Sequence, residues 1–82
     1  MRLDKFLKVS RIIKRRTIAN EACDAGRVGI NGKAAKASAE VKPGDIIGIA
    51  FGSHTGRYEV LDVREAATRH DASALCREIK EG

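Results

Sequence analysis

The residues of this sequence best suited to bind an anion are four consecutive polar side chains: Lys14, Arg15, Arg16 and Thr17. Apolar residues at helical spacing lie on both sides of them, which places them at the junction of two expected helices. The start of a helix leaves backbone N–H groups without partners, and beside three cations these groups favour phosphate. The preceding helix can add further cations to the same face: Arg2, Lys5, Lys8 and Arg11.

Positive charge is concentrated in the first part of the chain. The 82 residues carry 16 Lys and Arg against 11 Asp and Glu, which gives a net charge of +5. Residues 1–36 hold ten of the bases and three of the acids, whereas residues 37–82 hold six and eight. A charge run often only keeps a surface solvated, but this polarised distribution favours a polyanionic partner, either nucleic acid or an anionic membrane.

The other reactive side chains are few and scattered. His54 and His70 are isolated and are expected to be ordinary surface residues. Cys23 and Cys76 lie 53 positions apart, and neither has a second Cys or His at metal-ligand spacing. Both cysteines are expected to be small apolar residues of the core. Because no nucleophile, base and orienting group can be assembled, we expect no enzyme activity, no metal and no cofactor.

The membrane and single-strand alternatives need features that the sequence lacks. A membrane span needs about 20 apolar residues, and neither such a segment nor a signal peptide is found, so a cytoplasmic address is expected. Base stacking needs exposed aromatic residues, which make up only 4% of the whole chain. Structured RNA, recognised by shape and phosphate contacts, is therefore favoured. A protein-docking module that binds an acidic partner remains the alternative.

Two short helices are expected to carry the basic surface. Leu3, Phe6 and Leu7 repeat at helical spacing and predict a helix over residues 3–10. Asp4 falls in its first turn, where the helix dipole favours an anion. A second helix is predicted over residues 16–25 and ends at Gly26. Its apolar stripe is expected to consist of Ile18, Ala22 and Ala25, with Ala19 and Cys23 beside it, and the small residues of this face would permit close packing against the first helix.

A small antiparallel sheet is expected to support these helices. Residues 27–30 alternate as a strand, and Asn31-Gly32 predicts a hairpin turn before a return over 33–35. Residues 42–45 predict a turn with Pro43 at its second position. The remaining expected elements are a buried strand over 46–51, a loop over 52–56 and a strand over 57–63 with Tyr58, Val60 and Leu61 inward.

The end of the chain has the spacing of an amphipathic helix. Ala72, Leu75, Cys76 and Ile79 would share one face, with Asp71 as N-cap. The expected fold class is therefore α+β. It is a single domain over residues 1–82, in which two N-terminal helices pack on a small antiparallel β-sheet and a short C-terminal helix follows.

Several pieces of the sequence together resemble the S-four-type (αL) RNA-binding domain family, first named from a ribosomal protein. They are Arg2-Leu3-Asp4-Lys5-Phe6-Leu7, Lys14-Arg15-Arg16-Thr17 with Ala19, Gly26-Arg27-Val28, Val28-Gly29-Ile30-Asn31-Gly32-Lys33 and Val41-Lys42-Pro43-Gly44-Asp45. The resemblance covers residues 1 to about 50, the core αL motif, and matches less well beyond it. It implies that a helix pair with its adjoining turn forms an RNA surface.

Among free-standing members of about this length, the sequence is most similar to the RqcP family of bacterial ribosome-associated quality-control factors. That resemblance implies binding to the stalled large ribosomal subunit, with contacts to large-subunit rRNA and to peptidyl-tRNA. A partner tailing factor would meanwhile add C-terminal alanine to the nascent chain. The alternative is a heat-shock protein fifteen-like factor, which would recycle large subunits that hold a trapped nascent chain. No membrane partner is implied, and a monomer is expected.

Eight residues are candidates for binding RNA. The family motif assigns this role to Arg2 on the first helix and to Arg16 at the start of the second. Charge and position add six more: Lys5, Arg11, Lys14, Arg15, Thr17 and Lys33.

Overall fold

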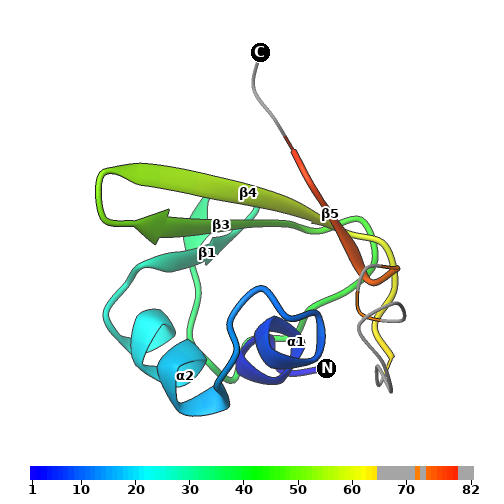
Figure 1. Ribbon diagram of the computed structural model, residues 1–82, viewed down its shortest axis with the longest axis horizontal. Coiled ribbons are helices and arrows are strands. Elements are labelled where there is room, and N and C mark those ends of the chain that lie inside the picture. The colour runs from blue at the N-terminus through cyan, green and yellow to red at the C-terminus, as the bar shows by residue number, and fades with distance from the viewer. Residues whose placement is uncertain (65–71, 73, 80–82) are drawn as a thin grey trace.

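The computed structural model describes residues 1–64, 72 and 74–79. Its elements, in chain order, are α1 (Leu3–Val9), α2 (Arg16–Asp24), β1 (Val28–Ile30), β2 (Lys33–Ala34), β3 (Ile46–Phe51), β4 (His54–Val60) and β5 (Cys76–Glu78). The strands form one antiparallel sheet in the order β2-β1-β3-β4-β5. Both helices lie against the same face of this sheet (Figure 1). The predicted α+β architecture of a helix pair on a small antiparallel sheet is confirmed.

The hydrophobic core lies between the helix pair and the sheet. From α1, Leu3, Phe6 and Leu7 are fully buried, and β3 presents Ile47 and Ile49 to the same core. The other strands and the segment before β5 complete it with Val28, Val60 and Leu75. Aliphatic residues thus supply most of the buried surface that stabilises the domain.

The start of α1 is held by a segment far away in the sequence. No side chain caps this helix. Instead, the backbone N–H of Leu3 donates to the carbonyl of Ala39 at 2.8 Å, and that of Asp4 donates to the carbonyl of Ala37 at 3.1 Å. We call residues 37–41 the strap. It satisfies the N–H groups that the beginning of a helix leaves without partners.

The end of α2 is a Schellman motif at Gly26, the residue at which the sequence predicted that the helix ends. Gly26 has a φ of 75°, which a glycine adopts without strain. The N–H of Gly26 donates to the Cys23 carbonyl and the N–H of Arg27 to the Ala22 carbonyl, both at 3.0 Å. This motif turns the chain from α2 directly into β1.

The predicted Asn31-Gly32 hairpin is also confirmed. Asn31 and Gly32 have φ values of 54° and 85°, which a type I′ turn requires. The Asn31 side chain ties this hairpin to the turn over residues 42–45. Its Oδ1 accepts from the Ile46 N–H at 3.0 Å, and its Nδ2 donates to Asp45 Oδ1 at 3.2 Å.

The register of the long hairpin corrects the predicted loop over residues 52–56. Phe51 pairs with His54, so only Gly52 and Ser53 form the turn and β4 begins at His54. In addition, β3 is buried on one face only, because its residues alternate between the core and the opposite side of the sheet. Leu61 lies beyond the end of β4 and is 45% exposed rather than inward.

The buried face of α2 is rotated from the predicted one. Ala19 and Cys23 are buried, whereas Ile18 is 49% exposed and Ala25 is exposed. The residues that α2 turns towards the core are therefore its smaller ones, and the larger Ile18 faces outward.

The predicted C-terminal helix is present at Ala72 but does not continue into residues 76–78. Residues Cys76–Glu78 form β5, which pairs with β4 through Cys76–Val60 and Glu78–Tyr58. The apolar spacing arises because Ala72 and Leu75 are buried before the strand begins. Pairing also covers the edge that β4 would otherwise expose. The proposed cap, Asp71, lies outside the described residues.

Candidate nucleic-acid interface

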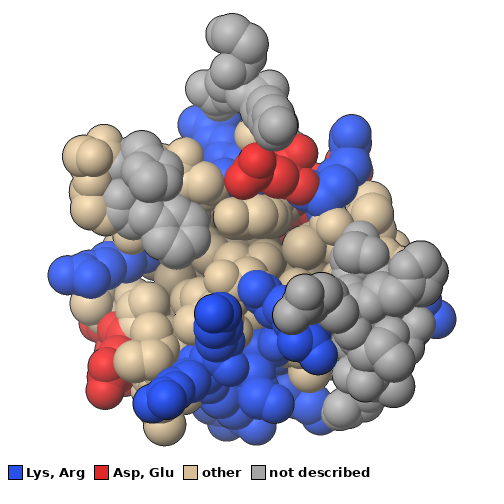
Figure 2. Space-filling model, in the orientation of Figure 1, with Lys and Arg blue, Asp and Glu red and all other residues tan. Residues whose placement is uncertain are grey.

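The basic residues gather mainly on the helix pair. Figure 2 shows Lys and Arg side chains concentrated over α1 and α2, on the side of the molecule away from the sheet. The helices can approach each other because the core-facing residues of α2, Ala19 and Cys23, are small. This packing brings the beginnings of both helices within reach of one carboxylate, that of Asp4.

Asp4 is the centre of a group of side chains that joins the two helices. Its Oδ1 and Oδ2 accept from Nε and Nη2 of Arg2 at 3.1 and 3.2 Å. Oδ2 also accepts from Arg16 Nε and from Asn20 Nδ2, each at 3.4 Å. We call Arg2, Asp4, Arg16 and Asn20 the Asp4 cluster. It links residues 16 positions apart into one rigid arrangement.

The carboxyl group of Asp4 is charged despite its burial. Burial raises its pKa, but four hydrogen bonds to the charged form together outweigh that effect. Their donors are Arg2, Asn20, the backbone N–H of Lys5 and Arg16. The pKa of Asp4 is therefore held below the ordinary value of 3.8, and the carboxylate anchors both arginines at neutral pH.

The two arginines remain available to a ligand. Their side chains are 51% exposed at Arg2 and 47% exposed at Arg16, whereas the Asp4 side chain is 3% exposed. Among the described residues, Arg16 contacts Asp4 through Nε, which leaves its two terminal nitrogens for another acceptor. A guanidinium presents a planar fork that binds phosphate with two hydrogen bonds. The Asp4 cluster therefore positions the two terminal nitrogens of Arg16 for such a contact, whereas Arg2 uses Nε and Nη2 on Asp4 and offers Nη1.

Lys14, Arg15 and Thr17 continue this surface along the beginning of α2. All three are exposed. Arg15 is the N-cap residue, with φ −123° and ψ 133°, and no side chain caps the helix. The first N–H groups of α2 therefore face outward beside cations, as the sequence predicted.

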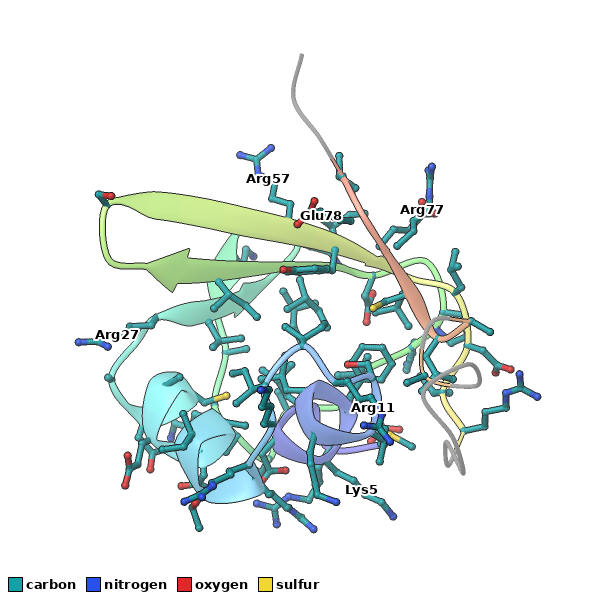
Figure 3. The ribbon with its side chains drawn as sticks, in the orientation of Figure 1. Lys5, Arg11, Arg27, Arg57, Arg77 and Glu78 are labelled. Carbon is teal, nitrogen blue, oxygen red and sulfur yellow. The ribbon has the colours of Figure 1, made fainter. Side chains whose placement is uncertain are left out.

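Lys5 lies on α1, and Arg11 lies just after the end of that helix. Figure 3 shows Lys5 pointing away from the sheet and Arg11 beside α1. Arg11 has a φ of 62°, in the left-handed region that residues other than glycine rarely adopt. The loop between the helices thus carries an arginine where a glycine would be less strained.

Lys33 lies on a different element from the other seven candidates. It pairs with Ile30 at the β1–β2 turn and is exposed. Together with Arg27 and Arg57 it lines a groove of the sheet. The structure therefore places seven candidates on the helix pair and its connection, and one on the hairpin.

Two members of the Asp4 cluster were not predicted as site residues. Asp4 was interpreted only through the helix dipole, and Asn20 was not singled out. Arg16 and Asn20 are four positions apart on one helix, which places them on the same face. The sequence therefore contained two signals of this cluster: the spacing of Arg16 and Asn20, and a single acid, Asp4, in a basic helix.

Neither cysteine is suited to act as a nucleophile. Burial, assisted by the charges of Asp4 and Asp24, raises the pKa of Cys23 to about 11. Burial also raises the pKa of Cys76, although a hydrogen bond with Ser10 opposes this. Thiols with raised pKa values are weakly reactive.

A metal site and a membrane-spanning helix each have requirements that the described residues do not meet. They contain no group of three or more His, Cys, Asp and Glu residues that could hold a metal ion. None of the described helices is long and apolar enough to cross a membrane.

Known proteins are similar to this chain in sequence and in fold. The S4 domain family matches residues 1–47. An RQC P-site tRNA stabilizing factor from Bacillus subtilis (strain 168) is 48% identical over 81 residues, which cover 99% of this chain and 94% of that protein. The corresponding factor from Halalkalibacterium halodurans is 51% identical over 81 residues, with coverages of 99% and 92%.

A solved structure agrees with these matches. The trimeric structure of Vibrio cholerae heat shock protein 15 superposes with a TM-score of 0.87 at 30% identity, covering 96% of this chain and 81% of that one. The sequence, the αL-type helix pair and these similarities together show that the chain belongs to the S4 domain family, among the RQC P-site tRNA stabilizing factors.

Proposed function

We propose that this chain binds structured RNA through its helix pair and stabilises P-site tRNA in ribosome quality control. The observation that carries the proposal is the Asp4 cluster, in which a buried carboxylate fixes two half-exposed arginines. Fixed guanidinium groups lose little conformational entropy when they bind phosphate. The names of the relatives supply the tRNA and the pathway.

We further propose that this chain acts on the stalled large ribosomal subunit in the cytoplasm. There it contacts large-subunit rRNA and peptidyl-tRNA, and it holds the tRNA while a partner factor adds C-terminal alanine. The chain contributes binding and positioning rather than catalysis. The strained backbone at Arg11 supports this site, because strained residues other than glycine often occur where a side chain has a binding role.

A pair of double variants tests the site. Arg2→Ala combined with Arg16→Ala should abolish cosedimentation with large subunits that carry peptidyl-tRNA. Lys42→Ala combined with Arg64→Ala removes the same charge from exposed positions outside the helix pair and should bind normally. Equal binding by the first variant and the wild type would show that the assigned site is wrong.

The salt dependence of binding tests the nature of the partner. Each phosphate contact should contribute about 0.7–0.9 to the slope of log affinity against log salt concentration. The Arg2→Ala, Arg16→Ala variant should therefore show a slope that is shallower by about 1.5. A flat response, with partners retained after nuclease treatment, would favour docking on an acidic protein surface.

The heat-shock protein fifteen-like role is a second candidate, favoured by the TM-score of 0.87. Alanine tailing separates the two roles. Removal of this chain from cells should reduce alanine tails on stalled nascent chains. Normal tailing with accumulation of large subunits that retain tRNA would instead favour the recycling role.

A further inference from the structure

The face of the sheet turned away from the helices carries a groove. Its volume is about 580 Å³, and its floor consists of small residues from three strands: Gly29, Ala34, Gly48 and Ala50. Residues that alternate with them in β3, Ile47 and Ile49, point into the core, which places the groove on the outer face. We call it the sheet groove. Because both helices lie against the other face of the sheet (Figure 1), the sheet groove and the Asp4 cluster lie on opposite sides of it.

The two glycines in the floor are there for different reasons. A Cβ atom on Gly29 would lie 2.7 Å from the backbone carbonyl oxygen of Lys33, so the β1–β2 hairpin excludes a side chain there. A Cβ atom on Gly48 would meet no atom within 4 Å, and the φ of Gly48 is not positive. The fold therefore does not require glycine at position 48.

A glycine that the fold does not require lowers the stability of the strand that contains it. Glycine in the interior of a strand loses conformational entropy and packs no side chain, so it weakens the strand. Glycine in a strand often marks a place where a ligand approaches the backbone closely. Gly48 lies at the centre of the floor, between Gly29 and Arg57 in the register of the sheet. Its missing side chain keeps the groove open.

The charged side chains that line the sheet groove, among the described residues, are all cations. Within the part of the chain that the structure describes, the lining includes three cations, Arg27, Lys33 and Arg57, and no Asp or Glu. In Figure 3, Arg27 extends outward beside β1, and Arg57 rises from β4 on the side away from the helices. The described part of the lining contains no aromatic residue on which a base could stack. This combination favours an extended phosphate backbone over exposed bases.

We propose that the sheet groove binds the sugar–phosphate backbone of a second RNA segment, so that the domain holds two RNA segments on opposite faces. The inference rests on the proposed function, in which the helix pair binds the first segment. An acidic peptide is the less fitting occupant, because extended peptides usually pair with the edge of a sheet rather than lie across its face.

A bridging experiment with the full chain tests this proposal. Bulk tRNA is immobilised, the protein is added, and capture of a labelled fragment mixture of large-subunit rRNA is measured. The wild type should capture the labelled RNA. Gly48→Val, which suits a strand and fills the groove, should still bind immobilised tRNA but capture at least tenfold less labelled RNA. Its melting temperature should equal or exceed that of the wild type.

Charge variants make the test independent of any effect of valine on folding. Arg27→Ala with Arg57→Ala should also lose capture, whereas Lys42→Ala with Arg64→Ala should keep it. The salt dependence of capture should become shallower by about 1.5 in the first pair, for two lost phosphate contacts. Crosslinked RNA should map to residues 27–34 or 48–57 in the wild type.

The outcomes separate the two proposals. If no variant of the sheet groove changes capture, this proposal is overturned while tRNA binding stands. If the wild type does not bind immobilised tRNA at all, the proposed function itself fails. If a polyglutamate peptide protects Gly48-containing peptides from proteolysis but labelled rRNA does not, the groove takes acidic protein and the RNA proposal is wrong.

Discussion

Asp4 contributes to a basic surface although its own charge is negative. It lowers the local positive charge, so any benefit to RNA binding must come from the positions that it imposes on Arg2 and Arg16. Attraction by net charge and positioning by a carboxylate therefore predict opposite effects when this acid is neutralised. Neutralising this one side chain can therefore separate the two explanations.

Asp4→Asn is the variant that separates them. It raises the net charge, so simple attraction would strengthen RNA binding. We expect the opposite: affinity for stalled large subunits should fall about tenfold, equivalent to about 1.4 kcal/mol, because both arginines lose their anchor. Glu21→Gln makes the same charge change at an exposed position of α2 and should not weaken binding. The measurement is a binding titration at fixed salt.

Stability at low pH should also depend on Asp4. Its pKa in the folded state lies below 3.8, the ordinary value for the unfolded chain, so the charged carboxylate stabilises the fold above that pH. This contribution should disappear as the pH falls below about 3.8, through the pKa of the folded state. Urea midpoints should therefore decrease more steeply for the wild type than for Asp4→Asn between pH 5 and about 2. Parallel curves would contradict a lowered pKa.

Replacing Arg11 with glycine should change the stability of the fold and the affinity for RNA in opposite directions. Arg11→Gly removes a side chain from the left-handed region and should raise the free energy of unfolding by up to about 1 kcal/mol. The same change should weaken RNA binding, because a cation leaves the surface. Arg11→Lys keeps both the charge and the backbone strain and should bind nearly as the wild type does. Chemical denaturation and the binding titration measure the two effects.

At the scale of elements, the turns and helix ends were the parts most predictable from sequence. Gly26 and Asn31-Gly32 have backbone preferences so specific that the Schellman motif and the hairpin follow from residue type. The C-terminal segment was not predictable in this way. Ala72, Leu75, Cys76 and Ile79 have the spacing of a helix face, but long-range pairing with β4 makes Cys76–Glu78 a strand. Local periodicity does not contain that information.

Proline substitution distinguishes a strand from a helix in this segment. The N–H of Ile79 donates to the carbonyl of Arg57 at 2.8 Å, so Ile79→Pro should destabilise the fold by about 1–3 kcal/mol. The N–H of Glu78 points away from β4 by the alternation of an antiparallel ladder, so Glu78→Pro should cost less. Equal losses in urea denaturation would argue against β5.

At the scale of the whole molecule, the sequence predicted which part of the chain carries the positive charge, but it did not predict the contacts that position the basic side chains. Ten bases in residues 1–36 predicted a basic face, and the helix pair carries most of it (Figure 2). The Asp4 cluster depends on contacts between residues 12 and 16 positions apart, which no periodicity encodes. The sheet groove likewise depends on the register that sets Gly29 beside Gly48.

The domain should be monomeric when no RNA is present. Among the described residues, the large hydrophobic side chains that are exposed are Ile18 and Leu61, which lie on different elements. A stable interface between copies needs a larger contiguous apolar surface than two separate side chains provide. Sedimentation equilibrium should give a mass near 8.9 kDa over a wide concentration range. A mass that rises towards a trimer would overturn this expectation.

The strap has a consequence for when the helix pair can form. With 7 residues, α1 is too short to be stable alone, and its first N–H groups depend on Ala37 and Ala39. During synthesis, α1 therefore cannot complete its hydrogen bonds until residues 37–41 have left the ribosome. The Asp4 cluster requires α1, so a nascent chain of this protein cannot present the assembled RNA surface early. More than half of the 82-residue chain must therefore be synthesised before the protein can bind RNA.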